Sequence, residues 1–315
     1  MIVFGPIPSR RLGRSLGINN IPPKVCSYSC IYCQLGKTDS MSIERKDFYS
    51  TEEIYKEVSE KISQLKKTEE NIDYITFVPD GEPTLDINLG KTIDRLKSFG
   101  VKIAVITNAS LLWDKEVRLD LMKADWVSVK IDSVYENIWH KINRPHGMLE
   151  FPRIIRGIKE FAAGYNGMLV TETMLVKSIN DSIESLSKTA QFINEIKPDK
   201  SYILVPTRPP AERIVKQPSE ENLNNAYQIY SSLISEVELI VYNEGTDFYY
   251  SSDAKQELLS ILAVHPMRKD AVEEFLSKSN SDVALIHHLM ENNLIQEVEY
   301  RSNFYYVKKL IDSEI

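Results

Sequence analysis

Three cysteines, Cys26, Cys30 and Cys33, are the residues whose spacing indicates chemistry most clearly, and the 315-residue chain has no others. They follow the pattern Cys-x3-Cys-x2-Cys, so one tight loop can present three thiolates. An odd number of cysteines is poor material for disulfides, which makes metal or redox chemistry the leading use. A [4Fe-4S] cluster usually takes four cysteines, so three would leave one iron open to an exogenous ligand.

A zinc site is the alternative use of the same thiols. Zinc prefers four nitrogen or sulfur ligands, often with cysteines at C-x2-4-C spacing. A histidine would then have to return as the fourth ligand, and the chain offers His140, His146, His265, His287 and His288. A second motif favours the cluster over zinc.

That motif is the turn Asp80-Gly81-Glu82-Pro83, which follows a predicted strand at 74–78. Gly81 allows a close backbone approach and Pro83 fixes the turn. The Glu82 carboxylate can accept hydrogen bonds from an ammonium group. The turn therefore predicts a site for an amino group, one strand after the cysteines.

The Cys-x3-Cys-x2-Cys spacing, with the aromatic Tyr32 directly before the last cysteine, resembles the radical S-adenosylmethionine (SAM) superfamily. The resemblance implies a [4Fe-4S] cluster on the three cysteines, with SAM on the open iron through its amino and carboxylate groups. It also implies that residues 80–83, a variant of the family's Gly-Gly-Glu-Pro turn, bind the amino group of SAM. Reductive cleavage of SAM would give methionine and a 5′-deoxyadenosyl radical that abstracts hydrogen from a substrate.

Polar residues at the ends of the next two predicted strands are further candidates. By the family's pattern, Asn108, Ser128 and Lys130 approach the ribose and the methionine carboxylate of SAM, since sites form at the carboxyl ends of barrel strands. The alternative for Thr107, Asn108 and Ser110 is that they cap the next helix. Weaker signals of the same kind are Glu172, Thr173 and residues 143–145.

Residues 5–19, with the strings TNASL, VSVKID and INRP, are similar to a group of radical SAM proteins related to wyosine-base synthases. This similarity covers about residues 5–210. True wyosine synthases modify a tRNA guanine and carry a second cluster on additional cysteines, which this chain lacks, so tRNA chemistry is disfavoured. Arg10, Arg11 and Arg14 could neutralise the cluster or an anionic substrate, or form a solvated loop.

The fold class predicted by periodicity is α/β, because helical periods alternate with short runs rich in β-branched residues. Six strand–helix units favour a partial (β/α)6 TIM-type barrel, and a doubly wound sheet is the alternative. The predicted strands are 16–19, 74–78, 102–107, 126–132, 168–176, 201–205 and 238–242. The predicted helices are 50–67, 89–99, 113–122, 151–163, 182–196 and 219–234.

The end of the chain differs in kind, so we predict one domain at 1–250, a boundary at 250–253 and a second domain at 254–315. Helices at 254–264, 269–277 and 282–292 precede two strands within 296–307, an order that resembles a winged helix. From Lys255 onward, seven basic residues face ten acidic ones, and the expected recognition helix at 281–293 has no Lys or Arg. Since DNA binding needs such groups, we expect a protein-contact or substrate-gating role instead.

Composition limits location and partners. No apolar run approaches the ~20 residues of a membrane-spanning helix, and the amino terminus has the wrong order for a secretory signal, so we expect a cytoplasmic protein without membrane contact. The net charge of −7 argues against broad nucleic-acid affinity. However, the first 38 residues carry five basic and no acidic residues, which concentrates positive potential beside the cysteines.

We therefore expect the protein to be a radical SAM enzyme that takes an electron from a low-potential donor such as ferredoxin or flavodoxin. A small molecule or cofactor precursor is the preferred substrate. A protein target, as for activases of glycyl-radical enzymes, and a tRNA base are the alternatives. A different class of function would be a non-enzymatic iron–sulfur redox sensor that binds DNA through the carboxyl-terminal domain.

Overall fold

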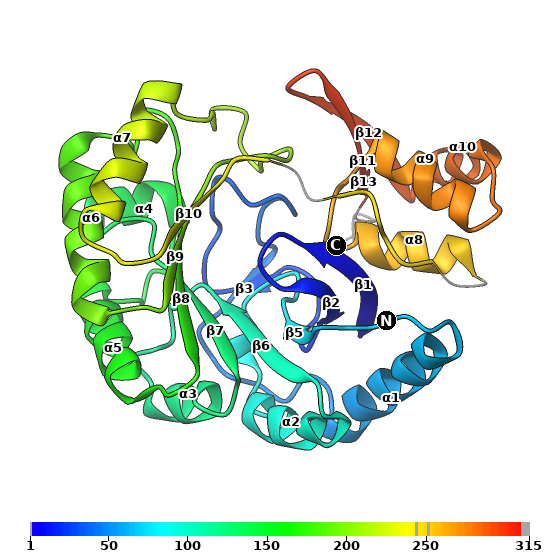
Figure 1. Ribbon diagram of the computed structural model, residues 1–315, viewed down its shortest axis with the longest axis horizontal. Helices are drawn as coiled ribbons and strands as arrows, with labels where there is room; N and C mark the ends of the chain where they lie inside the picture. The colour runs from blue at the N-terminus through cyan, green and yellow to red at the C-terminus, as the bar shows by residue number, and fades with distance from the viewer. Residues whose placement is uncertain (1, 243–244, 251–252, 310–315) are drawn as a thin grey trace.

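The larger part of the molecule is a curved sheet with helices on its outer side (Figure 1). The computed structural model describes residues 2–242, 245–250 and 253–309. Within these residues eight strands form one sheet in the order β1-β2-β5-β6-β7-β8-β9-β10. Their bounds are β1 Val3–Ser9, β2 Gly13–Ile18, β5 Tyr74–Phe77, β6 Lys102–Thr107, β7 Trp126–Lys130, β8 Met168–Met174, β9 Lys200–Leu204 and β10 Val237–Ile240.

All neighbours from β2 to β10 pair in parallel, and β1 pairs antiparallel with β2. The crossovers carry the helices α1 Thr51–Lys67, α2 Leu89–Leu96, α3 Lys115–Leu121, α4 Glu136–Asn143, α5 Phe151–Gly164, α6 Ile183–Ile196 and α7 Glu220–Ser231. Strand order follows chain order without reversal, so the sheet has no switch point of the doubly wound kind. The expected partial barrel of six strand–helix units is present, and β10 follows the sixth helix.

Alternation along each strand explains why the helices lie on one side. Outward residues such as Ile75, Val105 and Val127 join a core with the helices, while Trp126 and Val170 belong to a separate apolar cluster inside the curve. Helix α1 shows how the sequence starts such a helix. Ser50 and Glu53 cap its amino end reciprocally, as their spacing predicts, and four residues on one face are buried: Ile54, Val58, Ile62 and Leu65.

Strand β1 and helix α4 are among the elements that the sequence did not predict. Strand β1 was not expected, since Pro6 and Pro8 remove two donors. Such residues are tolerated because β1 is an edge strand, with an irregular register between Phe4 and Ile7. Helix α4 was also missed, because it is only eight residues long and ends at Arg144 in the left-handed conformation.

The carboxyl-terminal unit has its own core and the predicted element types. It comprises α8 Ala254–Leu262, β11 Met267–Arg268, α9 Lys269–Lys278, α10 Val283–Glu291, β12 Ile295–Tyr300 and β13 Asn303–Lys308. The three strands form a sheet in the order β11-β13-β12, and the helices bury Leu258, Phe275 and Leu289. The predicted boundary at 250–253 contains residues 251 and 252, and the predicted second domain contains 310–315. These positions lie outside the described residues, so the division stays a prediction.

Polar contacts fasten this unit to the barrel, and three of them illustrate how. The hydroxyls of Tyr300 and Tyr305 donate to the carbonyls of Pro206 and Thr207 at 3.1 and 2.9 Å. Lys61 on α1 pairs with Glu257 on α8 at 2.6 Å; Glu257 is buried and Lys61 is largely so. No helix in the described ranges is long and apolar enough to cross a membrane.

The Lys61–Glu257 pair generates a stability prediction. We expect Lys61→Met to lower the free energy of unfolding by about 3 kcal/mol, because it leaves the buried Glu257 carboxylate without its partner. The double variant Lys61→Met/Glu257→Met should recover most of this loss. Urea denaturation followed by circular dichroism measures both. Lys159→Met, which breaks an exposed pair with Glu195, is the matched control and should change little. If Lys61→Met and Lys159→Met lowered the free energy of unfolding equally, the prediction would be contradicted.

Candidate functional site

The cysteine loop lies across the carboxyl ends of β5, β6 and β7, and backbone bonds hold it on two sides. On one side, β3 (Val25–Cys26) forms a bridge with Gly81, and the Glu82 amide donates to the Val25 carbonyl at 3.2 Å. On the other side, Ser29 and Ile31 donate to carbonyls of residues 142–144 at the end of α4. The loop is thus fixed by the ends of two different strand–helix units.

The three cysteines are partly buried, unlinked by disulfides, and contacted by amide side chains. Asn108 lies 3.5 Å from Cys26 Sγ, and Asn143 lies 3.4 Å from Cys30 Sγ. Burial raises the pKa of all three thiols, that of Cys30 to about 12. A cationic metal centre is what would make such thiols thiolates, so this donor set fits a bound iron–sulfur cluster.

A zinc ion and an iron–sulfur cluster need different arrangements of ligands. Across the described part of the chain, no three Cys, His, Asp or Glu side chains are grouped as the ligands of one metal ion would be. Zinc needs every ligand within about 2.0–2.3 Å of a single centre. In a [4Fe-4S] cluster each cysteine binds a different iron, so its thiolates stand further apart. Among the described residues, no group of side chains forms such a single-ion site.

The turn after β5 depends on Gly81. Its φ is +154°, and a Cβ there would lie 1.9 Å from the Val25 carbonyl oxygen. Only glycine lets the turn approach the cysteine loop this closely. Pro83 begins the short 3-10 helix η1 (Pro83–Leu85), as expected of a residue that fixes a turn.

Asp80, which replaces the first glycine of the family's turn, is buried and pairs with Lys24 on the cysteine loop. Their side chains approach to 3.5 Å, and the Lys24 amide donates to the Asp80 carbonyl at 2.8 Å. Burial raises the pKa of the Asp80 carboxyl to about 6, although the Lys24 charge opposes the shift. Lys24 itself was not singled out by the sequence.

The Glu82 carboxylate is already hydrogen-bonded within the chain. It accepts from the Thr84 amide and hydroxyl at 3.1 and 2.6 Å, from the Thr107 hydroxyl at 2.6 Å and from the Asn108 amide at 2.7 Å. Burial raises the pKa of Glu82 despite these bonds. The carboxylate joins the turn to the end of β6, a contact that no local sequence pattern indicates.

Asn108 contacts the cysteine loop and also closes a turn. Its side-chain Nδ2 donates to Ser27 Oγ at 2.9 Å, while its Oδ1 accepts from the Ser110 backbone amide at 2.9 Å. The capping alternative is wrong for the helix, since Asp114 caps α3. Ser128 is not brought to the cysteines: it is buried and donates to Glu172 at 2.6 Å.

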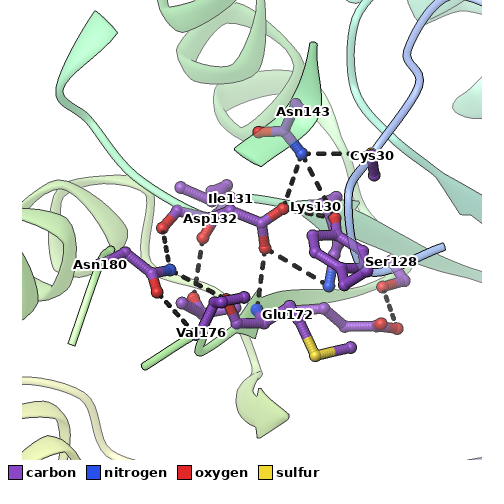
Figure 2. A network of polar contacts seen from close by, with 12 residues as sticks. Cys30, Ser128, Lys130, Ile131, Asp132, Asn143, Glu172, Val176 and Asn180 are labelled. Carbon is purple, nitrogen blue, oxygen red and sulfur yellow. Dashed lines mark hydrogen bonds and ion pairs between the residues drawn. The ribbon is translucent and has the colours of Figure 1, made fainter. Parts of the chain in front are cut away.

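Asp132 is the centre of a polar network that the sequence did not single out, and Figure 2 shows it. Its carboxylate accepts hydrogen bonds from the Tyr32 hydroxyl, from Asn143 at 2.8 Å and from the Met174 amide at 2.8 Å. Lys130 lies 3.4 Å away and 5.1 Å from the centre of the Tyr32 ring. Because Asn143 also reaches Cys30, the network links the end of β7 to the cysteine loop. The position of Asp132, directly after β7, was the available signal.

A second buried pair lies inside the sheet. Arg11, from the β1–β2 hairpin, forms an ion pair with Glu172 on β8, and Arg11 Nε is buried without a hydrogen-bond partner. Burial acts to raise the pKa of Glu172, but the charges of Arg11 and Lys130 and the bond from Ser128 lower it below its usual range. Arg11 is therefore not part of a solvated loop.

A cavity of about 920 Å³ opens between the cysteine loop and the carboxyl-terminal unit. Its barrel side includes Asn19, Lys24, Gln34 and Asp80, and its other side includes Asn293, Gln296 and Lys308. The volume is within the ~300–1,000 Å³ range of small-molecule sites. Space for a ligand therefore adjoins residues at both ends of the cysteine loop, Lys24 and Gln34.

A curved parallel sheet with three thiols held over its carboxyl edge defines a class of iron–sulfur enzymes. Residues 20–193 match the model of the Radical SAM superfamily, and the chain belongs to this superfamily. Its members are enzymes that use a [4Fe-4S] cluster and SAM and need an electron from a reductant. The predicted family, enzyme class and cofactors are confirmed.

The chain is 45% identical to a UPF0026 protein of Methanocaldococcus jannaschii, over 98% of this chain and 96% of that one. It also resembles the crystal structure of a radical SAM methyltransferase from Sphaerobacter thermophilus, with a TM-score of 0.54 and 14% identity over 71% of this chain and 66% of that one. A structure of TYW1 with a lysine-pyruvate adduct matches with a TM-score of 0.51 and 16% identity, over 70% and 74%. At these identities, the two structures support the fold alone.

Gly81 allows a direct test of the site's geometry. We expect Gly81→Ala to lose most of the iron bound after anaerobic reconstitution and to cost about 1–3 kcal/mol of stability, because the added methyl group overlaps the Val25 carbonyl. Iron per chain and thermal unfolding are the measurements. Gly147→Ala is the control, since its Cβ would meet no atom within 4 Å. Wild-type iron content in Gly81→Ala would show that the close approach is not needed.

The Arg11–Glu172 pair predicts a pH dependence. Arg11→Met should cost about 3 kcal/mol at neutral pH, because the Glu172 carboxylate stays buried and loses the largest of the charges that offset its burial. In this variant the pKa of Glu172 rises above its unfolded value, so protonation favours the folded state and the deficit should shrink as pH falls from about 7 to about 5.

Adding Glu172→Gln to Arg11→Met should remove much of the deficit at neutral pH, since the neutral amide still accepts from Ser128. Urea denaturation of the variants at both pH values tests this. A deficit that stays constant with pH would count against the ion pair as its cause.

Proposed function

We propose that this radical SAM enzyme acts on a small molecule or cofactor precursor, with its cofactors held where the cysteine loop meets the ends of β5, β6 and β7. The observation that carries the proposal is the fixed cysteine loop: three thiols, no fourth, bound by backbone contacts to the Gly81 turn and to the end of α4. When bound, the reduced cluster and SAM supply a 5′-deoxyadenosyl radical that abstracts hydrogen from the substrate.

Within this proposal Cys26, Cys30 and Cys33 are the cluster ligands. Residues 80–83 shape the SAM amino-group site through their backbone, because the Glu82 carboxylate is committed to Thr84, Thr107 and the Asn108 amide. Glu82 thereby fixes the turn that the sequence assigned to SAM.

Other residues of the site orient these groups. Asn108 steadies the Cys26 side of the loop, and Asp132 with Tyr32 and Asn143 steadies the Cys30 side. Lys130 faces the Tyr32 ring and offers a cation toward the SAM carboxylate. Ser128 acts indirectly, by holding Glu172.

The cavity beside the loop supports a small substrate over a polymer, because its size suits one and the carboxyl-terminal unit forms a wall across it. The order of helices and strands in that unit is the one expected of a winged helix. Helix α10, in the place of a recognition helix, has no Lys or Arg, so we assign the unit to gating the cavity or contacting a protein.

A low-potential donor such as ferredoxin or flavodoxin would reduce the cluster. Three unlinked thiols and a reduced cluster need a reducing compartment, so the cytoplasm is the proposed location.

Anaerobic reconstitution tests the function. After reduction with dithionite, we expect SAM to shift the EPR signal of the cluster and to be cleaved to 5′-deoxyadenosine by the wild type. Cys30→Ala should give neither result, while Lys159→Ala, on the outer face of α5, should behave as wild type. A cluster that forms but neither responds to SAM nor cleaves it would reject the enzyme and favour the redox sensor.

A further inference from the structure

Lys24 has an unusual environment for a lysine. Its side chain is 5% exposed, and its Nζ is buried without a hydrogen-bond partner, since Asp80 is 3.5 Å away. Its backbone is in the left-handed region, with φ of 63°. An ammonium group can donate three hydrogen bonds, and leaving them unmade in the interior is costly. Such a group is expected where a ligand supplies the missing acceptors.

The cavity of 920 Å³ places Lys24 where a ligand can reach it. Lys24 and Asp80 both line this cavity, two residues before the first cysteine and at the turn after β5. The only other charged residues among its described lining are Lys308 and Lys309, from the carboxyl-terminal unit. Three lysines against one aspartate give the walls an excess of positive charge.

The second wall adds groups that suit an anion. Asn292, Asn293 and Gln296 are among the residues that line the cavity, and a side-chain amide can donate hydrogen bonds to an anion. The Asn292 amide also donates to the His288 carbonyl at 2.7 Å, and Asn293 Oδ1 accepts from Lys309 at 3.0 Å. Burial raises the pKa of the Asp80 carboxyl, and the opposing influences are the charge of Lys24 and, more weakly, the charge of Lys308. The two parts of the chain thus face each other across one electropositive space.

We propose that Lys24, oriented by Asp80, binds a carboxylate or phosphate group of the substrate, and that Lys308 of the carboxyl-terminal unit completes this site. The inference rests on the proposed function, because it places the anionic group beside the cluster loop. It also explains the aspartate in place of the family's glycine: the carboxylate fixes the lysine. Asp80 is therefore a positioning residue, and the carboxyl-terminal unit contributes to substrate selection.

Anion binding to the full-length, reconstituted protein tests the proposal without turnover. The probes are inorganic phosphate and succinate, titrated by calorimetry at constant ionic strength with chloride as reference. The better-bound probe identifies the anionic group. Since Lys24→Met alone leaves Asp80 buried and unpaired, the informative variant is Lys24→Met/Asp80→Asn. We expect its Kd for that probe to rise about tenfold or more, as loss of a charge-assisted bond implies.

Lys308→Met should weaken the same probe, whereas Lys159→Met should not. Circular dichroism and iron content must match the wild type, and Asp80→Asn with Lys24 retained serves as a second, charge-keeping variant that should bind the probe more weakly than wild type. Unchanged anion affinity in the double variant would overturn the proposal, as would probes that bind no better than chloride.

Competition with SAM distinguishes a site for a substrate anion from a site for the SAM carboxylate. Saturating SAM should leave phosphate or succinate binding in place, and its displacement by SAM would assign Lys24 to the SAM carboxylate and overturn the proposal. Anion binding that depends on Lys24 in a protein that does not cleave SAM would reject the proposed function and not the anion site. SAM cleavage without anion binding would reject the anion site and leave the proposed function standing.

Discussion

The cofactor site depends on how closely the backbone of the cysteine loop can approach the turn after β5. Gly81 permits the approach, and the Val25 carbonyl fills the space that any side chain would need. The Glu82 amide then bonds to Val25, while the Glu82 carboxylate bonds to the end of β6. One short segment therefore aligns the cysteine loop with two strands. A parallel sheet supplies the aligned strand ends that make such a junction possible.

The regular strand–helix units of the barrel could be predicted from the sequence. Alternating periods located the parallel strands and most helices, because each strand buries one face against the helices and each helix buries one stripe. It did not predict β1, whose two prolines are compatible only with an edge strand, or α4, which is too short for a clear period. Both depend on neighbours far away in the chain.

The site shows the same division. The three cysteines and the turn at residues 80–83 could be proposed from the sequence because their chemistry is local and their spacing is distinctive. The bonds of Glu82 to Thr107 and of Asn143 to Cys30 join distant segments, so no spacing could indicate them. Asp132 and Lys24 were missed for a related reason, since a charged residue reads as exposed until the fold buries it. Only the folded structure shows that such a residue is buried and which side chain it contacts, and these two facts mark it as part of the candidate site.

The contact between β1 and α8 also has a consequence for how the chain matures. Strand β1 forms one edge of the sheet and is made long before α8, the helix that packs against it. Until α8 arrives, the growing polypeptide presents an unpaired strand edge of the kind that recruits other strands. The irregular register and the prolines of β1 make that edge a poor template during synthesis. The same features that hid β1 from sequence periodicity thus protect the nascent chain before α8 packs against it.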